Sequence, residues 1–122
     1  MLLQKEATDT NVNIKAYQAG EIKLNIGIFN QVVFLADGDK KDFSGAQNLA
    51  QLSFEDLSKH LETKPEIFII GTGNKHQPFS AKIIQKINAM GIAIEAMASR
   101  QACHTYQVLT FEQRRVYALI YP

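Results

Sequence analysis

Two short stretches of the chain combine residues that could bind or transform a ligand, and the first is Gly71-Thr72-Gly73-Asn74. It follows an apolar run, and its two glycines permit backbone conformations that bring N–H groups close to an anion. The stretch is not a dinucleotide fingerprint, because position 76 is His, and it lacks the Gly-Lys-Ser/Thr of a Walker phosphate loop. A ligand-binding role and a simple sharp exit from a buried strand are both compatible with it.

The second stretch begins at Met97 and leads through Arg100 to Cys103 and His104. If a helix starts here, its free N–H groups attract anions, and Arg100 can hold a carboxylate or phosphate in bidentate fashion. Arg100 can equally tie the loop to Glu112 or to a backbone carbonyl. Cys103 can be a thiolate favoured by the helix dipole, or an inert packed thiol, which is the interpretation that we favour. His104 projects about 100° away from Cys103 around a helix, so their spacing alone does not make a nucleophile and base pair.

No complete catalytic arrangement accompanies these residues. The sequence offers no paired carboxylates, no serine nucleophile elbow and no metal-ligand cluster at usable spacing. We therefore expect no catalytic residue, no metal site and no cofactor. The candidate cleft, which would take a protein partner or a small anionic ligand, consists of Gly71, Thr72, Gly73, Met97, Arg100 and Cys103.

The elements that must position this cleft follow from the spacing of apolar residues, which changes from period two to a helical period along the chain. The first third is predicted to be an antiparallel meander, and the rest alternates strands and helices, with Gly91 ending one helix in a left-handed conformation. Because ligands bind at the carboxyl ends of parallel strands, both stretches should lie at one edge of a sheet. The predicted elements are strands within 14–28 and at 32–35, a helix at 54–61, a strand at 67–70, a helix at 80–90, a strand at 92–96, a helix at 99–110 and a strand at 116–121.

The fold class that this order predicts is α/β, with three layers, a mixed central sheet flanked by helices, and an N-terminal antiparallel meander. The 122 residues correspond to one domain, which we place at 13–122 after a mobile leader at 1–12. A net charge of +1 argues against nucleic-acid binding, and no apolar run approaches the length of a transmembrane segment. A single cysteine and the lack of a secretory signal favour the cytoplasm.

The C-terminal half carries motifs beyond composition: Gly71-Thr72-Gly73, Gly91-Ile92, Met97, the run from Arg100 to Tyr106, Val108-Leu109, Glu112, Arg114 and Val116. With these motifs the chain, from about Ile14 to Pro122, resembles the Mth-type domain family of uncharacterised proteins, whose relatives include mitochondrial complex I assembly factor 3. The resemblance implies a three-layer α/β fold and no established enzyme activity. Gln107 stands where the family commonly has Asn, Ala98-Ser99 where it has Asp-Thr, and Phe43 where a tryptophan is frequent.

Two hypotheses for the function follow. The first is a non-enzymatic accessory or assembly-type interaction protein with an unidentified protein partner, which the resemblance implies. The alternative is a binding protein or enzyme for a small anionic ligand, using the cleft at the carboxyl ends of the strands. A scaffold tolerates the exchanges at Ala98 and Gln107 more easily than strict catalytic geometry does.

Overall fold

The computed structural model describes residues 11–122, and its centre is a five-stranded sheet with the order β5-β4-β8-β6-β7. Strand β6 runs parallel to both β7 and β8, whereas β4 runs antiparallel to β8 and to β5. All six residues of β8 are buried, as expected for an apolar strand with a neighbour on each side. The strands are β4 (Val33–Ala36), β5 (Asp39–Lys41), β6 (Ile67–Thr72), β7 (Ala93–Met97) and β8 (Val116–Tyr121).

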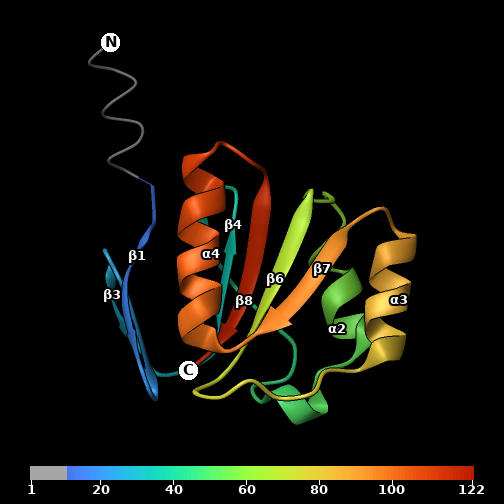
Figure 1. Cartoon of the computed structure of the whole chain (residues 1–122), viewed down its shortest axis with the longest axis horizontal. Helices are drawn as coiled ribbons and strands as arrows, with labels where there is room; N and C mark the ends of the chain where they lie inside the picture. Colours follow the sequence, from blue (N-terminus) through green and yellow to red (C-terminus); the bar gives the residue numbers. More distant parts are fainter. Residues whose placement is uncertain (1–10) are drawn as a thin grey trace.

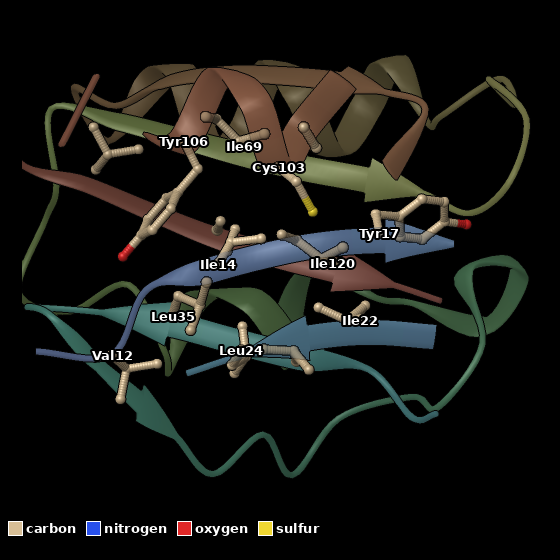
Figure 2. Packing of buried hydrophobic residues seen from close by; sticks show 14 residues of the cluster. Val12, Ile14, Tyr17, Ile22, Leu24, Leu35, Ile69, Cys103, Tyr106 and Ile120 are labelled. Carbon is tan, nitrogen blue, oxygen red and sulfur yellow. The ribbon is translucent and has the colours of Figure 1, made fainter. Parts of the chain in front are cut away.

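A separate antiparallel sheet contains β1 (Ile14–Gln18), β2 (Glu21–Leu24) and β3 (Gly27–Phe29). Its inner side chains, Ile14, Tyr17, Ile22 and Leu24, belong to one buried cluster with the five-stranded sheet (Figure 2). Helix α4 (Ser99–Phe111) packs on the same face of the five-stranded sheet, beside the small sheet (Figure 1). One outer layer of the fold therefore consists of the small sheet and helix α4, side by side.

The predicted meander through residue 35 is wrong in its last part. Strand β4 does not extend the small sheet but pairs with β8, and the register places Phe34 opposite Leu119. All four residues of β4 are buried. A strand of this kind needs cover on both faces, which a meander with one solvated face cannot give. A turn at residues 37–38 follows β4 and leads into the short edge strand β5.

The opposite face of the five-stranded sheet is covered by η1 (Leu49–Gln51), α2 (Phe54–Ser58) and α3 (Ala81–Ala89). Ser53 begins α2 with a capping box that it forms with Asp56, and the Ser80 hydroxyl accepts from the Ile83 N–H at the start of α3. The helix predicted at 54–61 ends early, although Leu61 stays buried in the following turn. Gly91 has φ +87°, which confirms the left-handed residue predicted after α3.

Alternation along the central strands divides the interior in two. Ile69, Ala118 and Ile120 point toward α4 and the small sheet, whereas Phe68 and Leu119 point toward α2 and α3. The resulting architecture has three layers, and the mixed five-stranded sheet is the middle one (Figure 1). The predicted α/β fold class is confirmed.

Residues 1–10 of the predicted leader lie outside the described residues. The last leader residue, Val12, is buried, and its N–H donates to the Gly38 carbonyl at 2.9 Å. Within residues 11–122, no helix combines the length and the apolar character that crossing a bilayer demands.

Candidate functional site

Strands β6 and β7 end at the same edge of the sheet, and each ends slightly later in the sequence than predicted. Strand β6 includes Gly71 and Thr72, and β7 includes Met97. Gly71 lies opposite Met97 in one neighbouring strand and opposite Ile120 in the other. Gly71 and Met97 are thus brought together, but as paired residues inside the sheet rather than as loop residues around an opening.

The glycine at position 71 allows helix α4 to approach the sheet. A Cβ atom there would lie 2.7 Å from Ser99 Oγ and 3.1 Å from Ser99 Cα, so Ser99 and the start of α4 would have to move to admit a side chain. The backbone of Gly71 has no positive φ, so its need for glycine is steric. Gly73 is different, because its φ of +107° favours glycine by conformation.

Ser99 fills the space that a ligand at these glycines would need. Its buried hydroxyl accepts from the Gly73 N–H at 2.8 Å and donates to the Tyr121 carbonyl. In return, the Ser99 N–H donates to the Gly73 carbonyl at 2.8 Å. The N–H group of Gly73 and the first N–H of α4 are therefore both satisfied within the protein. Sequence reasoning did not assign Ser99, although a small hydroxyl residue at the first position of a helix was the available signal.

Thr72 is also engaged by its own loop. Its hydroxyl donates to the Lys75 carbonyl at 2.8 Å and accepts from the Gln77 N–H at 3.2 Å, while Gln77 Nε2 donates to the Thr72 carbonyl at 3.1 Å. Thr72 and Gly73 line an open pocket of about 420 Å³ that ends at the C-terminus, and the other four predicted cleft residues do not line it. The pocket is lined by Gln47, Asn48, Leu49, Ala50, Thr72, Gly73, Asn74, Gln77, Tyr121 and Pro122.

Arg100 lies on the other side of α4, against the small sheet. Its guanidinium carbon is 5.6 Å from the centre of the Tyr17 ring, a cation–π distance. The ion pairs formed within residues 11–122 involve neither Arg100 nor Glu112, so the predicted tie between these two residues is not formed there. The buried Tyr17 hydroxyl has no hydrogen-bond partner among the described residues.

Cys103 is buried, with its sulfur pointing from α4 into the apolar cluster (Figure 2). Burial raises the pKa of its thiol to about 11, and the nearby Arg100 charge offsets only part of that effect. The thiol is therefore protonated at neutral pH, which is the opposite of what a nucleophile requires. Cys103 is packed, as favoured from the sequence, and its lack of reactivity stays a prediction. The side chain of the next residue, His104, is exposed, so the structure does not bring this imidazole to the buried thiol.

A larger pocket than the one at Thr72 and Gly73 lies at the opposite end of α4 and was not predicted. It encloses about 870 Å³ between the start of β1, the C-terminal half of α4 and the residues that precede β8. Gln107 lines this pocket and donates through Nε2 to the Ile14 carbonyl. We call this pocket the α4 groove; its apolar lining comes from Val12, Ile14, Tyr106, Phe111 and Val116, and its charged rim from Lys15, Asp37, Arg114 and Arg115.

Phe111 stands at the side of the α4 groove with 89% of its surface exposed, and Val108, one turn earlier, is 42% exposed. Exposed large apolar side chains that cluster on one face mark interaction sites. The charged turn beside them, at residues 112–115, forms ion pairs with other parts of the chain. Arg114 contacts Glu66 at 3.0 Å and Arg115 contacts Asp37 at 3.3 Å.

Comparison with known proteins identifies the relatives of this chain. A family model described as "Protein of unknown function (DUF498/DUF598)" matches residues 14–121. The chain belongs to this family. Among DUF498/DUF598 relatives, a Francisella tularensis protein named "13 kDa major membrane protein" is 34% identical over 121 residues, covering 98% of each chain.

A second relative is the mouse NADH dehydrogenase (ubiquinone) 1 alpha subcomplex assembly factor 3, which is 34% identical over 76 residues. That match covers 62% of this chain and only 40% of the relative. Among solved structures, a Xanthomonas campestris protein superposes with a TM-score of 0.84 at 28% identity, covering 98% of this chain and 91% of that one.

A Bordetella pertussis protein described as a Mth938-like domain has a TM-score of 0.76 at 23% identity, over 92% of this chain and 85% of that one, and so supports the fold. The predicted resemblance to the Mth-type domain family is confirmed. Among residues 11–122, no group of three or more His, Cys, Asp or Glu side chains is placed to hold a metal ion.

Proposed function

We propose that this DUF498/DUF598 protein is a non-enzymatic accessory factor of the assembly type, which binds a protein partner at the α4 groove. The observation that carries the proposal is the 89% exposure of Phe111 beside a groove of about 870 Å³. Covering the exposed Phe111 ring with a second surface removes apolar area from water, and this contributes favourably to the free energy of binding. The predicted domain at 13–122 is part of the same proposal.

The composition of the groove favours a protein over a small ligand. Phe111, Tyr106 and the two arginines of the rim are the residue types enriched at protein interfaces. The charged residues that line the groove are Lys15, Arg114, Arg115 and Asp37; Arg115 pairs with Asp37, and Arg114 pairs with the neighbouring Glu66. The partner that fits is therefore a segment that presents an apolar anchor to Phe111.

The relatives support an accessory role without defining the partner. One relative is named as an assembly factor of NADH dehydrogenase, and the match covers 40% of that protein. The buried, protonated thiol of Cys103 supports the non-enzymatic side of the proposal, because it is the candidate nucleophile of the predicted cleft. We also propose a cytoplasmic location, which a single unpaired cysteine favours.

A second candidate function is binding of a small anion at Arg100, on the side of α4 that faces the small sheet. It is favoured by Arg100, which has no carboxylate partner among the described residues, and by the unpartnered hydroxyl of Tyr17 beside it. The two candidates use opposite ends of α4, so single substitutions separate them.

The test is affinity purification from the native host with wild-type protein, Phe111→Ala, Arg100→Glu and Ile28→Ala, followed by mass spectrometry of bound proteins and small molecules. Ile28→Ala is the matched control, because Ile28 is an exposed apolar residue outside the groove. The partner found is then purified and titrated directly. We expect Phe111→Ala to weaken binding by at least about tenfold and Ile28→Ala to leave it unchanged.

Equal binding by wild type and Phe111→Ala would contradict the α4 groove. A bound anionic metabolite that is lost only in Arg100→Glu, with no directly binding protein, would replace the proposal by the second candidate. Turnover of that metabolite would overturn the non-enzymatic assignment.

A further inference from the structure

The pocket at the carboxyl ends of β6 and β8 is lined, among the described residues, by no charged side chain. It encloses about 420 Å³ between residues 47–50, the loop that follows β6 and the end of β8. The last two of these segments lie together at one edge of the sheet (Figure 1). Charged residues make up 20% of the chain, so ten lining residues would ordinarily include about two. We call it the amide pocket, after Gln47, Asn48, Asn74 and Gln77.

The four carboxamides decide what the amide pocket can recognise. Each carboxamide has an oxygen that accepts hydrogen bonds and an NH₂ group that donates them. Asparagine and glutamine therefore pair in bidentate fashion with a flat ligand edge that has a donor beside an acceptor, as they do with adenine. Leu49 and Ala50 add apolar contact area to the same lining. The pocket thus combines the polar and the apolar contacts that a heterocyclic ring requires.

The wall formed by the loop after β6 holds its carboxamides ready for a ligand. The Gln77 N–H donates to Thr72 Oγ1 at 3.2 Å, and Gln77 Nε2 donates to the Thr72 carbonyl at 3.1 Å. These bonds use one N–H of the Gln77 amide, whereas its Oε1 accepts no hydrogen bond from residues 11–122. The exposed side chain of Asn74 forms no hydrogen bond within that range either. The oriented amide of Gln77 and the free amide of Asn74 are thus available to a ligand.

The opposite wall is fixed to the body of the fold. Asn48 Oδ1 accepts from the Gln51 N–H at 3.2 Å, and Asn48 Nδ2 donates to Gln51 Oε1 at 3.2 Å. The Ala46 N–H donates to the Asp56 carboxylate at 3.1 Å, and the Ala46 carbonyl accepts from the Tyr121 hydroxyl at 3.0 Å. The segment between Ala46 and Asn48 is therefore tied to both α2 and β8, so the pocket does not depend on an unsupported loop.

The neutral lining selects the charge of the ligand. Phosphates and carboxylates are bound most tightly by Arg and Lys, and ammonium groups by carboxylates, but no such side chain lines the pocket within residues 11–122. Its volume lies within the roughly 300 to 1,000 Å³ of small-molecule sites, and ligands of α/β folds bind at the carboxyl ends of strands. We propose that the amide pocket binds an uncharged nucleobase or nucleoside, whose ring edge pairs with the carboxamides of Gln47, Asn74 and Gln77.

This site is separate from the two candidates for the function. The amide pocket shares no lining residue with the α4 groove, and Arg100 lines neither. The ligand is held by side chains, so it makes no use of the Gly73 N–H, which Ser99 already satisfies. A protein partner at the groove and a nucleobase at the amide pocket are therefore independent, and the failure of one leaves the other intact.

The experiment is an NMR titration of the isotope-labelled full chain with adenine, adenosine, adenosine monophosphate and glucose. We expect adenine or adenosine at about 1 mM to shift the resonances of residues 47–50 and 72–77. The tighter of the two identifies the free base or the nucleoside as the ligand. Adenosine monophosphate should bind within about twofold of adenosine, because the lining offers no cation to its phosphate. Glucose, which lacks a flat edge with a donor beside an acceptor, should not bind.

Substitutions of exposed carboxamides test the pairing. Gln47 and Asn74 are both exposed, so the double variant Gln47→Ala, Asn74→Ala removes two carboxamides and leaves the core intact. It should weaken adenosine binding by at least about tenfold. The matched control is Gln85→Ala on α3, which removes an exposed carboxamide outside the pocket and should bind as the wild type does. Thermal unfolding of each variant checks that the fold is kept, and Asn74→Asp replaces the double variant if that one unfolds.

Three results would overturn the proposal. One is the absence of shifts with adenine and adenosine alike. Another is an unchanged affinity in the double variant, or an equal loss in Gln85→Ala. The third is binding of adenosine monophosphate more than about tenfold tighter than adenosine, or of glucose as tightly as adenosine, since the pocket would then recognise a phosphate or a sugar.

Discussion

Ser99 and Cys103 illustrate how single side chains decide what the edge of the sheet can do. The Ser99 hydroxyl joins the loop at Gly73 to the end of β8, so polar groups that would face a ligand are used internally. One turn later, Cys103 faces the apolar cluster beneath α4. Both residues stabilise the contact between α4 and the sheet, and neither is presented to solvent.

The burial of Cys103 predicts a pH dependence of stability. The thiol has an ordinary pKa of 9.0 and a pKa of about 11 in the folded protein, so between these values the unfolded chain has lost a proton that the folded chain keeps. Because the folded state then binds more protons, the free energy of unfolding must fall as pH rises through this range. Urea unfolding of wild type and Cys103→Ala should therefore show a steeper decline for the wild type. Parallel declines would contradict the burial of the thiol.

At the scale of elements, β6 is the strand on which the two parallel pairings depend. It lies between β7 and β8, and α4 packs on it from one side. Its residues Phe68, Ile69 and Ile70 are almost completely buried, pointing alternately to the two faces. An apolar side chain removed from this strand leaves a cavity that neither layer can fill without moving the helices.

Ile69→Ala should lower the free energy of unfolding by about 2 to 5 kcal/mol, because Ile69 is fully buried under α4. The matched control is Ile28→Ala, which removes the same atoms from an exposed strand position and should change stability by less than about 0.5 kcal/mol. Urea unfolding measures both values. A cost below about 1 kcal/mol for Ile69→Ala would contradict the central place of β6.

The whole molecule has two cores on the two faces of one sheet, but its layers are attached differently. Strands β4, β6, β7 and β8 are joined by continuous ladders, whereas the small sheet is held mainly by the side chains of its inner face. Two hydrogen bonds supplement that packing, from the Val12 N–H to Gly38 and from the Gln107 side chain to Ile14. The small sheet can thus separate from the rest at a lower cost than the central strands can.

Hydrogen exchange under native conditions should reveal this difference. Amides of β6 and β8 should exchange only through global unfolding, whereas amides of β1 to β3 should exchange with a smaller free energy of opening, as one unit. Equal opening free energies in the two sheets would show that the molecule opens only as a whole.

The elements whose identity depends on local spacing could be predicted from the sequence. The apolar runs at 67–70 and 116–121 became central strands, and Gly91 ended α3 in the predicted conformation. The strand at 33–36 was recognised as a strand but assigned to the wrong sheet, because a strand's partner is chosen across the fold. The predicted end of β6 is too early, since a glycine inside a strand resembles a turn residue in the sequence until the contact with a neighbouring helix explains it.

The sequence by itself determined the α/β class and the residue types present at the edge of the sheet, because periodicity and composition are local properties. Only the tertiary structure decided which of those residues are free to act. Ser99, 26 positions away from Gly73, satisfies the N–H that a ligand would have bound. Phe111 and Ile28, ordinary core types in the sequence, remain exposed because no other element of the described chain lies over them. Exposure depends on what lies opposite in space, and that is settled by contacts between distant parts of the chain.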